Sequence, residues 1–168
     1  MAARGTYTTI YRKKLADLAA GELTESVRDN LPIMWFAVGE GGFTLLPNGT
    51  KTPSLPEASR EALVSTIPMA NNTESTTGGF FTKTIDPLDV SINNRDVTVR
   101  CVLSATEAGL DNRSRLTGNA NGNPHLFELG IFDGDPNTAP ATLMAYCTFD
   151  EIVKISGVQV AIEITIKY

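Results

Sequence analysis

The chain contains a single histidine, His125, so any site that requires two histidine side chains is excluded. A Ser-His-Asp or Cys-His arrangement stays open, because one histidine suffices for either. However, the chain has no Gly-x-Ser-x-Gly nucleophile elbow, and neither cysteine lies in a context that would lower its pKa. The sequence therefore predicts no catalytic residue, and we expect a protein that is not an enzyme.

The two cysteines, Cys101 and Cys147, each occupy an alternating apolar position of a predicted strand. This placement predicts two buried free thiols, because an unpaired cysteine behaves as a small apolar side chain. A disulfide between them would need the two strands to be suitably adjacent, and the sequence leaves that open.

Residues 39–42, Gly-Glu-Gly-Gly, invite comparison with a phosphate-binding loop, in which glycines let the backbone approach a phosphate. Thr44 stands where a dinucleotide fingerprint needs its last glycine, and no Gly-Lys-Ser/Thr follows. We therefore predict a turn that ends a strand, with glycine adopting positive φ angles.

Residues 133–137, Asp-Gly-Asp-Pro-Asn, begin like a calcium-binding loop, in which alternate oxygen side chains surround the ion. Thr138 replaces the glycine that such a loop requires, and Met144 occupies the position of its bidentate glutamate. The segment therefore predicts a hairpin turn with local side-chain hydrogen bonds, and no metal or cofactor site is expected.

Glu128 interrupts an otherwise apolar strand, and a buried carboxylate is costly unless it is paired or hydrogen-bonded. One interpretation is a catalytic acid with a perturbed pKa. The favoured interpretation is a structural ion pair with an arginine, for example Arg60 or Arg100.

Most of the elements that would position these residues are predicted strands. Residues 125–132 and 143–149 alternate around a turn and predict a β-hairpin. In its first strand Phe127, Leu129 and Ile131 should share one face. The remaining predicted strands are 31–38, an apolar run buried on both faces, and 80–85, 97–103 and 158–168.

Two helices are also predicted. Residues 10–20 have an amphipathic pattern, and the helix that they predict ends at Gly21. A second helix is predicted at 56–66, because Ser54 and Glu57 have the spacing of a capping box at its start. The expected fold class is α+β, mainly antiparallel β, with an N-terminal helix and one further short helix. The whole chain, residues 1–168, should form a single compact domain with an N-terminal helical segment (1–30) and a β-rich core (31–168).

The charge and the distribution of apolar residues exclude some classes of function. The 168 residues carry a formal net charge of -5, which does not favour a nucleic-acid partner. No apolar run approaches the roughly 20 residues that cross a bilayer, and no signal-peptide pattern follows the N-terminal basic residues. We therefore expect a soluble protein made in a cytoplasm, with no membrane partner.

Three segments resemble one known family. They are Phe-Ala-Val-Gly-Glu-Gly-Gly at 36–42, residues 55–69, which are similar to a Leu-x-x-Glu-x-x-Arg-x-x-Ile block of that family, and Glu-Leu-Gly-Ile-Phe-Asp at 128–133 followed by Leu-Met-Ala at 143–145. In this order they resemble the N-terminal domain of bacteriophage tail-collar fibre proteins, over residues 31–166. The resemblance implies a structural signature made of Gly39, Gly41, Gly42, Glu128, Gly130 and Asp133.

The resemblance implies a structural virion protein of a phage tail, produced in the cytoplasm of a host bacterium. The chain stops where fibre proteins continue into a shaft, so we expect a baseplate or tail-fibre adaptor subunit that joins fibres to the baseplate through protein–protein contacts. By family analogy it should form a homo-oligomer, with a trimer favoured. The alternative is a receptor-binding domain that recognises a host-surface carbohydrate or protein.

Contacts with other tail proteins are expected on polar segments that lack periodicity. These are the N-terminal segment through residue 14, the loop at 71–79 and the long loop at 106–124. The candidate contact residues in them are Arg12, Lys13, Asn72, Arg113 and Arg115.

Overall fold

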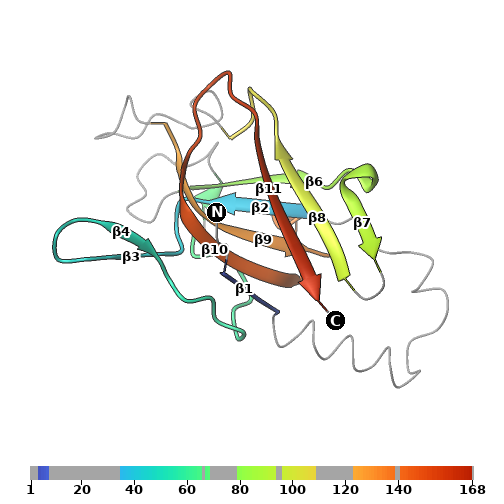
Figure 1. Ribbon diagram of the computed structural model, residues 1–168, viewed down its shortest axis with the longest axis horizontal. Coiled ribbons are helices and arrows are strands. Elements are labelled where there is room, and N and C mark those ends of the chain that lie inside the picture. Colours follow the sequence, from blue (N-terminus) through green and yellow to red (C-terminus); the bar gives the residue numbers. More distant parts are fainter. Residues whose placement is uncertain are drawn as a thin grey trace.

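The computed structural model describes residues 4–7, 35–65, 67–68, 79–93, 96–108, 123–138 and 141–167. These residues form strands and one short 3-10 turn, η2 (Pro87–Asp89) (Figure 1). The strands are β1 (Arg4–Tyr7), β2 (Trp35–Gly39), β3 (Phe43–Leu45), β4 (Lys51–Pro53), β5 (Ile67–Pro68), β6 (Gly79–Thr84), β7 (Val90–Asn93), β8 (Asp96–Leu103), β9 (His125–Phe132), β10 (Leu143–Val153) and β11 (Val160–Lys167).

The strands are arranged in three sheets. The largest has the order β1-β10-β9-β2-β6-β5, the second has the order β11-β8-β7, and β3 and β4 pair separately. All pairings are antiparallel except that of β5 with β6. The predicted hairpin is confirmed as β9 and β10, near the middle of the largest sheet.

The main core lies between the two larger sheets, because buried side chains of both belong to one cluster. The six-stranded sheet contributes Phe36, Val38, Leu129, Ile131, Cys147 and Phe149, and the three-stranded sheet contributes Val99, Cys101, Leu103 and Ile162. A second cluster covers the opposite face of the six-stranded sheet and contains Ala37, Leu63, Phe132, Leu143 and Tyr146. Strand β2 is therefore buried on both faces, as its apolar run predicted.

The alternation of apolar residues is confirmed in most of the sandwich. In β11, Ile162 is buried while Glu163 faces solvent. In β9, Leu129 and Ile131 share the main core, but Leu126 joins them there and Phe127 packs against Phe43 instead. The predicted face of Phe127 is therefore wrong, at the end of β9 where its pairing with β10 shifts register.

The predicted α+β class is wrong. In the described residues the fold is mainly antiparallel β, and residues 54–65 form irregular structure in place of the predicted second helix. The reason is tertiary: the N–H groups of Val64 and Ser65 donate to Glu128 instead of to carbonyls of a preceding helical turn. The predicted helix at 10–20 lies outside the described residues. No helix among the described residues is long and apolar enough to cross a bilayer.

Candidate functional site: the Glu128 cluster

The structure brings together four of the six predicted signature residues. Gly39, Gly41 and Gly42 surround the side chain of Glu128, whereas Gly130 and Asp133 lie further along the same hairpin. The five predicted partner-contact residues, Arg12, Lys13, Asn72, Arg113 and Arg115, lie outside the described residues.

Glu128 projects from the middle of β9, and its side chain is 0% exposed. One carboxylate oxygen, Oε1, accepts a hydrogen bond from the backbone N–H of Ser65 at 2.8 Å. The other, Oε2, accepts from the N–H of Val64 at 2.8 Å and from the hydroxyl of Tyr146 at 2.9 Å. The carboxylate therefore holds residues 64–65 against the outer face of the sheet.

Within the described part of the chain, Glu128 is not paired with either arginine that was named as its candidate partner. The Arg60 guanidinium instead lies over the ring of Tyr146, 5.1 Å from its centroid, and pairs with Glu57 at 3.5 Å. Arg100 pairs with Asp89. Two backbone N–H groups and one phenol already satisfy the carboxylate, which removes the need for a cation. Burial, followed by the charge of Glu128, raises the pKa of Tyr146, so its hydroxyl stays a donor.

The glycines are required because Glu128 occupies the space where their side chains would lie. The pairing of β2 with β9 sets Gly39 opposite Glu128. A Cβ at Gly39 would lie 2.5 Å from Glu128 Oε1, and one at Gly41 would lie 2.8 Å from the same atom. Gly42 has a φ of 77°, and a Cβ there would lie 2.8 Å from Glu128 Cβ. The predicted strand-ending turn with a positive-φ glycine is confirmed.

We expect Gly39→Ala to lower the free energy of unfolding by about 1–3 kcal/mol, because the added methyl group overpacks a site closed by Glu128 and by Ser65 Oγ. The ideal Cβ would lie 2.7 Å from that Ser65 atom. Gly134→Ala is the matched control, since its Cβ would come no closer than 3.8 Å to another atom. Urea unfolding measures both, and equal stabilities would contradict the packing described.

A second buried carboxylate, Glu40, belongs to the same glycine segment and was not singled out from the sequence. Its Oε2 accepts from the N–H of Gly79 at 2.8 Å, and its Oε1 accepts from the N–H of His125 at 3.3 Å. The side chain therefore ties the start of β6 to the start of β9. The signal in the sequence was an acid enclosed by glycines directly after an apolar strand.

The other two signature residues serve the hairpin itself. A Cβ at Gly130 would lie 2.7 Å from Leu143 Cδ1, so this glycine permits close packing. Asp133 accepts a hydrogen bond from the N–H of Thr142 at 2.6 Å, and Asp135 accepts one from the N–H of Asn137 at 2.9 Å. The predicted hairpin turn is confirmed. Among the described residues no group of three or more potential ligands is placed to hold a metal ion.

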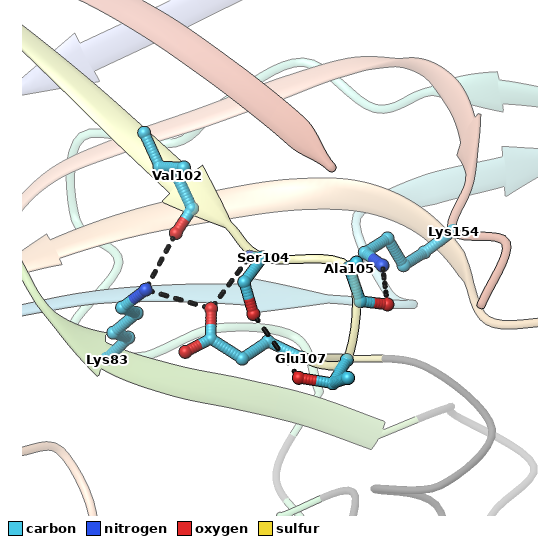
Figure 2. A network of polar contacts seen from close by, with 7 residues as sticks. Lys83, Val102, Ser104, Ala105, Glu107 and Lys154 are labelled. Carbon is cyan, nitrogen blue, oxygen red and sulfur yellow. Dashed lines mark hydrogen bonds and ion pairs between the residues drawn. The ribbon is translucent and has the colours of Figure 1, made fainter. Parts of the chain in front are cut away.

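A separate polar network joins β6 to the turn after β8 and was also missed (Figure 2). Lys83 Nζ donates to Glu107 Oε2 at 2.8 Å and to the carbonyl of Val102 at 3.2 Å. The same oxygen of Glu107 accepts from the N–H of Ser104 at 2.8 Å. Burial would raise the pKa of Glu107, but these hydrogen bonds and the charge of Lys83 outweigh it, so the pKa is lowered.

The lowered pKa of Glu107 predicts a pH-dependent contribution to stability. This contribution is present above the unfolded-state pKa, near 4.5, and is lost as the pH falls through the lower folded-state pKa. We expect Glu107→Gln to be less stable than the parent chain at neutral pH, with the gap narrowing in acid. Urea unfolding at several pH values measures this, and a gap that does not change with pH would contradict it.

Lys154 is buried beside this network, with 0% of its surface exposed. Its Nζ donates to the carbonyls of Ala105 and Ile155, both at 3.3 Å (Figure 2 shows the first). Burial lowers the pKa of Lys154, and the charge of Glu107 opposes that shift. The Lys154 side chain therefore connects the turn at Ala105 to the segment that follows β10.

The two cysteines are buried and free, as predicted, and lie in the one core cluster that joins the sheets. Burial raises the pKa of Cys147 to about 12, so its thiol stays protonated at neutral pH. Burial likewise raises the pKa of Cys101. Neither thiol is therefore prepared to act as a nucleophile.

These features define a class: an antiparallel β-sandwich whose central hairpin carries a buried glutamate enclosed by glycines. Both oxygens of Glu128 are engaged by donors of the chain itself, so the carboxylate holds residues 64–65 against the sheet. Comparisons with protein-family models, with curated proteins and with solved structures find no match for this chain.

Proposed function

We propose that the chain is a structural protein of a phage tail, a baseplate or tail-fibre adaptor subunit that works through protein–protein contacts. The proposal starts from the resemblance of residues 36–42 and 128–133 to the tail-collar fibre family. The observation that carries it is the meeting of these two segments around Glu128, since Gly39, Gly41 and Gly42 all pack on that side chain. Residues that form the resemblance thus form one structural unit.

The hydrogen bonds of the buried carboxylates also agree with a structural role. The buried carboxylates of Glu40 and Glu128 both accept hydrogen bonds from the backbone. The single tryptophan, Trp35, packs partly buried against the cluster that contains Phe132, so it is not an exposed platform on which a sugar could stack. This favours the adaptor over the receptor-binding alternative.

Cross-linking mass spectrometry on purified particles tests the proposal. We expect the chain to be present in the particles and to cross-link to both baseplate and fibre proteins. Absence from the particles would overturn it, and cross-links only to host-surface molecules during infection would favour the receptor-binding function.

A further inference from the structure

Strand β11 lies at the edge of the three-stranded sheet, where β8 is the only described strand that pairs with it (Figure 1). It has eight residues, and its register with β8 continues from Val160 to Lys167 without a shift. An edge strand leaves one row of backbone N–H and C=O groups unpaired, and that row can pair with another strand. Strand β11 is therefore a long and regular edge that can accept a further strand.

The other edge strands of the described sheets are protected by their length. Each has four residues or fewer; they are β1, β3, β4, β5 and β7. Proteins also protect sheet edges with proline or with a bulge. Strand β11 contains neither, and it consists mostly of valine, isoleucine and threonine, which favour strand pairing.

The outer face of β11 carries charges of both signs. Strand alternation places Glu163, Thr165 and Lys167 on this face, and Glu163 is exposed. Arg100 is opposite Glu163 on β8, but its guanidinium pairs with Asp89 at 3.4 Å. Among the described residues Glu163 has no ion pair, so its carboxylate can receive a cation from a strand on the other side.

A second copy of β11 supplies a cation at the required position. When two copies pair antiparallel about a two-fold axis at Thr165, residue 163 of each copy lies opposite residue 167 of the other. This register sets each Glu163 opposite a Lys167, and opposite charges across a strand pair stabilise it. A register centred on residue 163 would set two carboxylates opposite each other, which is destabilising. Strand β11 is therefore complementary to itself in the register centred on Thr165.

We propose that two copies of this chain pair through β11, antiparallel and centred on Thr165, and thereby join their three-stranded sheets into one continuous sheet. The contact uses the same strand of both copies, so it closes as a two-fold dimer and leaves neither β11 edge open. The inference deepens the proposed function, on which it rests, by naming the contact that assembles the subunit. It gives a dimer where the family resemblance implies a trimer.

Sedimentation velocity of the purified full chain over a wide concentration range tests the dimer. We expect the parent to dimerise, and Glu163→Lys to weaken dimerisation by about tenfold or more, because two attractive charge pairs become repulsive. Glu61→Lys is the matched control, since it makes the same charge change at an exposed residue outside β11. It should dimerise like the parent.

A mixture of two charge variants gives the sharper result. Lys167→Glu should also dimerise weakly on its own, because it sets acids opposite acids. Mixed with Glu163→Lys, it restores opposite charges at both positions of the pairing. The mixture should therefore form a dimer with one copy of each variant, while each variant alone stays largely monomeric. Circular dichroism should show that both variants remain folded.

The register has a test of its own. Thr165 lies on the two-fold axis of the proposed pair, so Thr165→Cys should form a disulfide between the two copies under mild oxidation. Ala161→Cys is the control: it lies on the same exposed face, but in this register it is about 26 Å from its counterpart at the usual rise per residue. The two native cysteines are buried, so a non-reducing gel should report the introduced thiol.

Four results would each overturn the inference: a parent that is monomeric at all concentrations, a trimer in place of a dimer, dimerisation unaffected by Glu163→Lys, or no association in the mixture of charge variants. A monomeric parent whose Thr165→Cys variant cross-links to another tail protein would assign the edge to that partner instead. These measurements of the purified chain need no particles, so they can fail while the chain is still found in the tail, or succeed while it is not.

Discussion

Glu128→Ala should destabilise the fold more than any other change described here, by about 3–5 kcal/mol, because buried donors that lose their acceptor cost about 1–3 kcal/mol each. The N–H groups of Val64 and Ser65 and the hydroxyl of Tyr146 would all lose that acceptor. Equilibrium unfolding in guanidinium chloride measures the loss. Amide hydrogen exchange of residues 64 and 65 should accelerate more than that of the β8–β11 pair.

Two conservative variants separate the contributions to this effect. Glu128→Gln keeps the shape but sets an amide NH₂ against one of the donors, so its cost should be smaller than that of alanine. Tyr146→Phe removes only the phenol and should cost about 1 kcal/mol, the value of one ordinary hydrogen bond. If Glu128→Ala unfolds at the denaturant concentration of the parent, the glutamate does not hold residues 64–65 as described.

Ile131→Ala should lower the free energy of unfolding by about 2–5 kcal/mol, because it opens a cavity in the main core. Ile131 is fully buried and lies in the central strand β9, between β2 and β10. Urea unfolding is the measurement, and the slope of the transition should stay unchanged if only the native state is affected.

The matched control for this cavity is Ile155→Ala, which removes the same atoms from a half-exposed side chain. It should cost well under 1 kcal/mol, since surface substitutions usually change stability little. Similar losses in the two variants would show that the inner face of β9 is assigned wrongly.

The longer strands β2, β6, β8, β9, β10 and β11 could be predicted from the sequence because burial imposes a period on their residues. The strands of four residues or fewer, β1, β3, β4, β5 and β7, were not predicted, because they are too short to show that period. Alternation places Ile162 inside and Glu163 outside without knowledge of the partner strand. The shift at Phe127 could not be predicted, because it coincides with an irregular register between β9 and β10. Register is a property of two strands, whereas periodicity is a property of one.

The error at residues 56–66 has a related cause. The capping-box spacing of Ser54 and Glu57 indicates a local preference for a helix. However, the N–H groups of Val64 and Ser65 donate to Glu128, which is distant in the sequence, and so are not available for hydrogen bonds within a helix. Intrinsic propensity is weak enough for tertiary contacts to override it.

The sequence marked Glu128 and three glycines of the candidate site, but it marked neither Tyr146 nor the arrangement of these residues. The sequence marked Gly39 and Glu128 separately, and only the antiparallel pairing of β2 with β9 sets them opposite each other. An arginine was the expected partner of Glu128 because a buried carboxylate is costly unless it is paired or hydrogen-bonded. Backbone donors leave no residue-type pattern, so no sequence reasoning could have chosen them.

The strand order of the largest sheet also determines when the protein can fold during synthesis. Strand β2 is made early but pairs with β9, and β1 pairs with β10, which is made later still. Until residues 125–153 have left the ribosome, the apolar strand β2 has neither its central neighbour nor the Glu128 side chain that its glycines accommodate. We therefore expect this chain to fold late in translation and to depend on chaperones that shield apolar nascent segments.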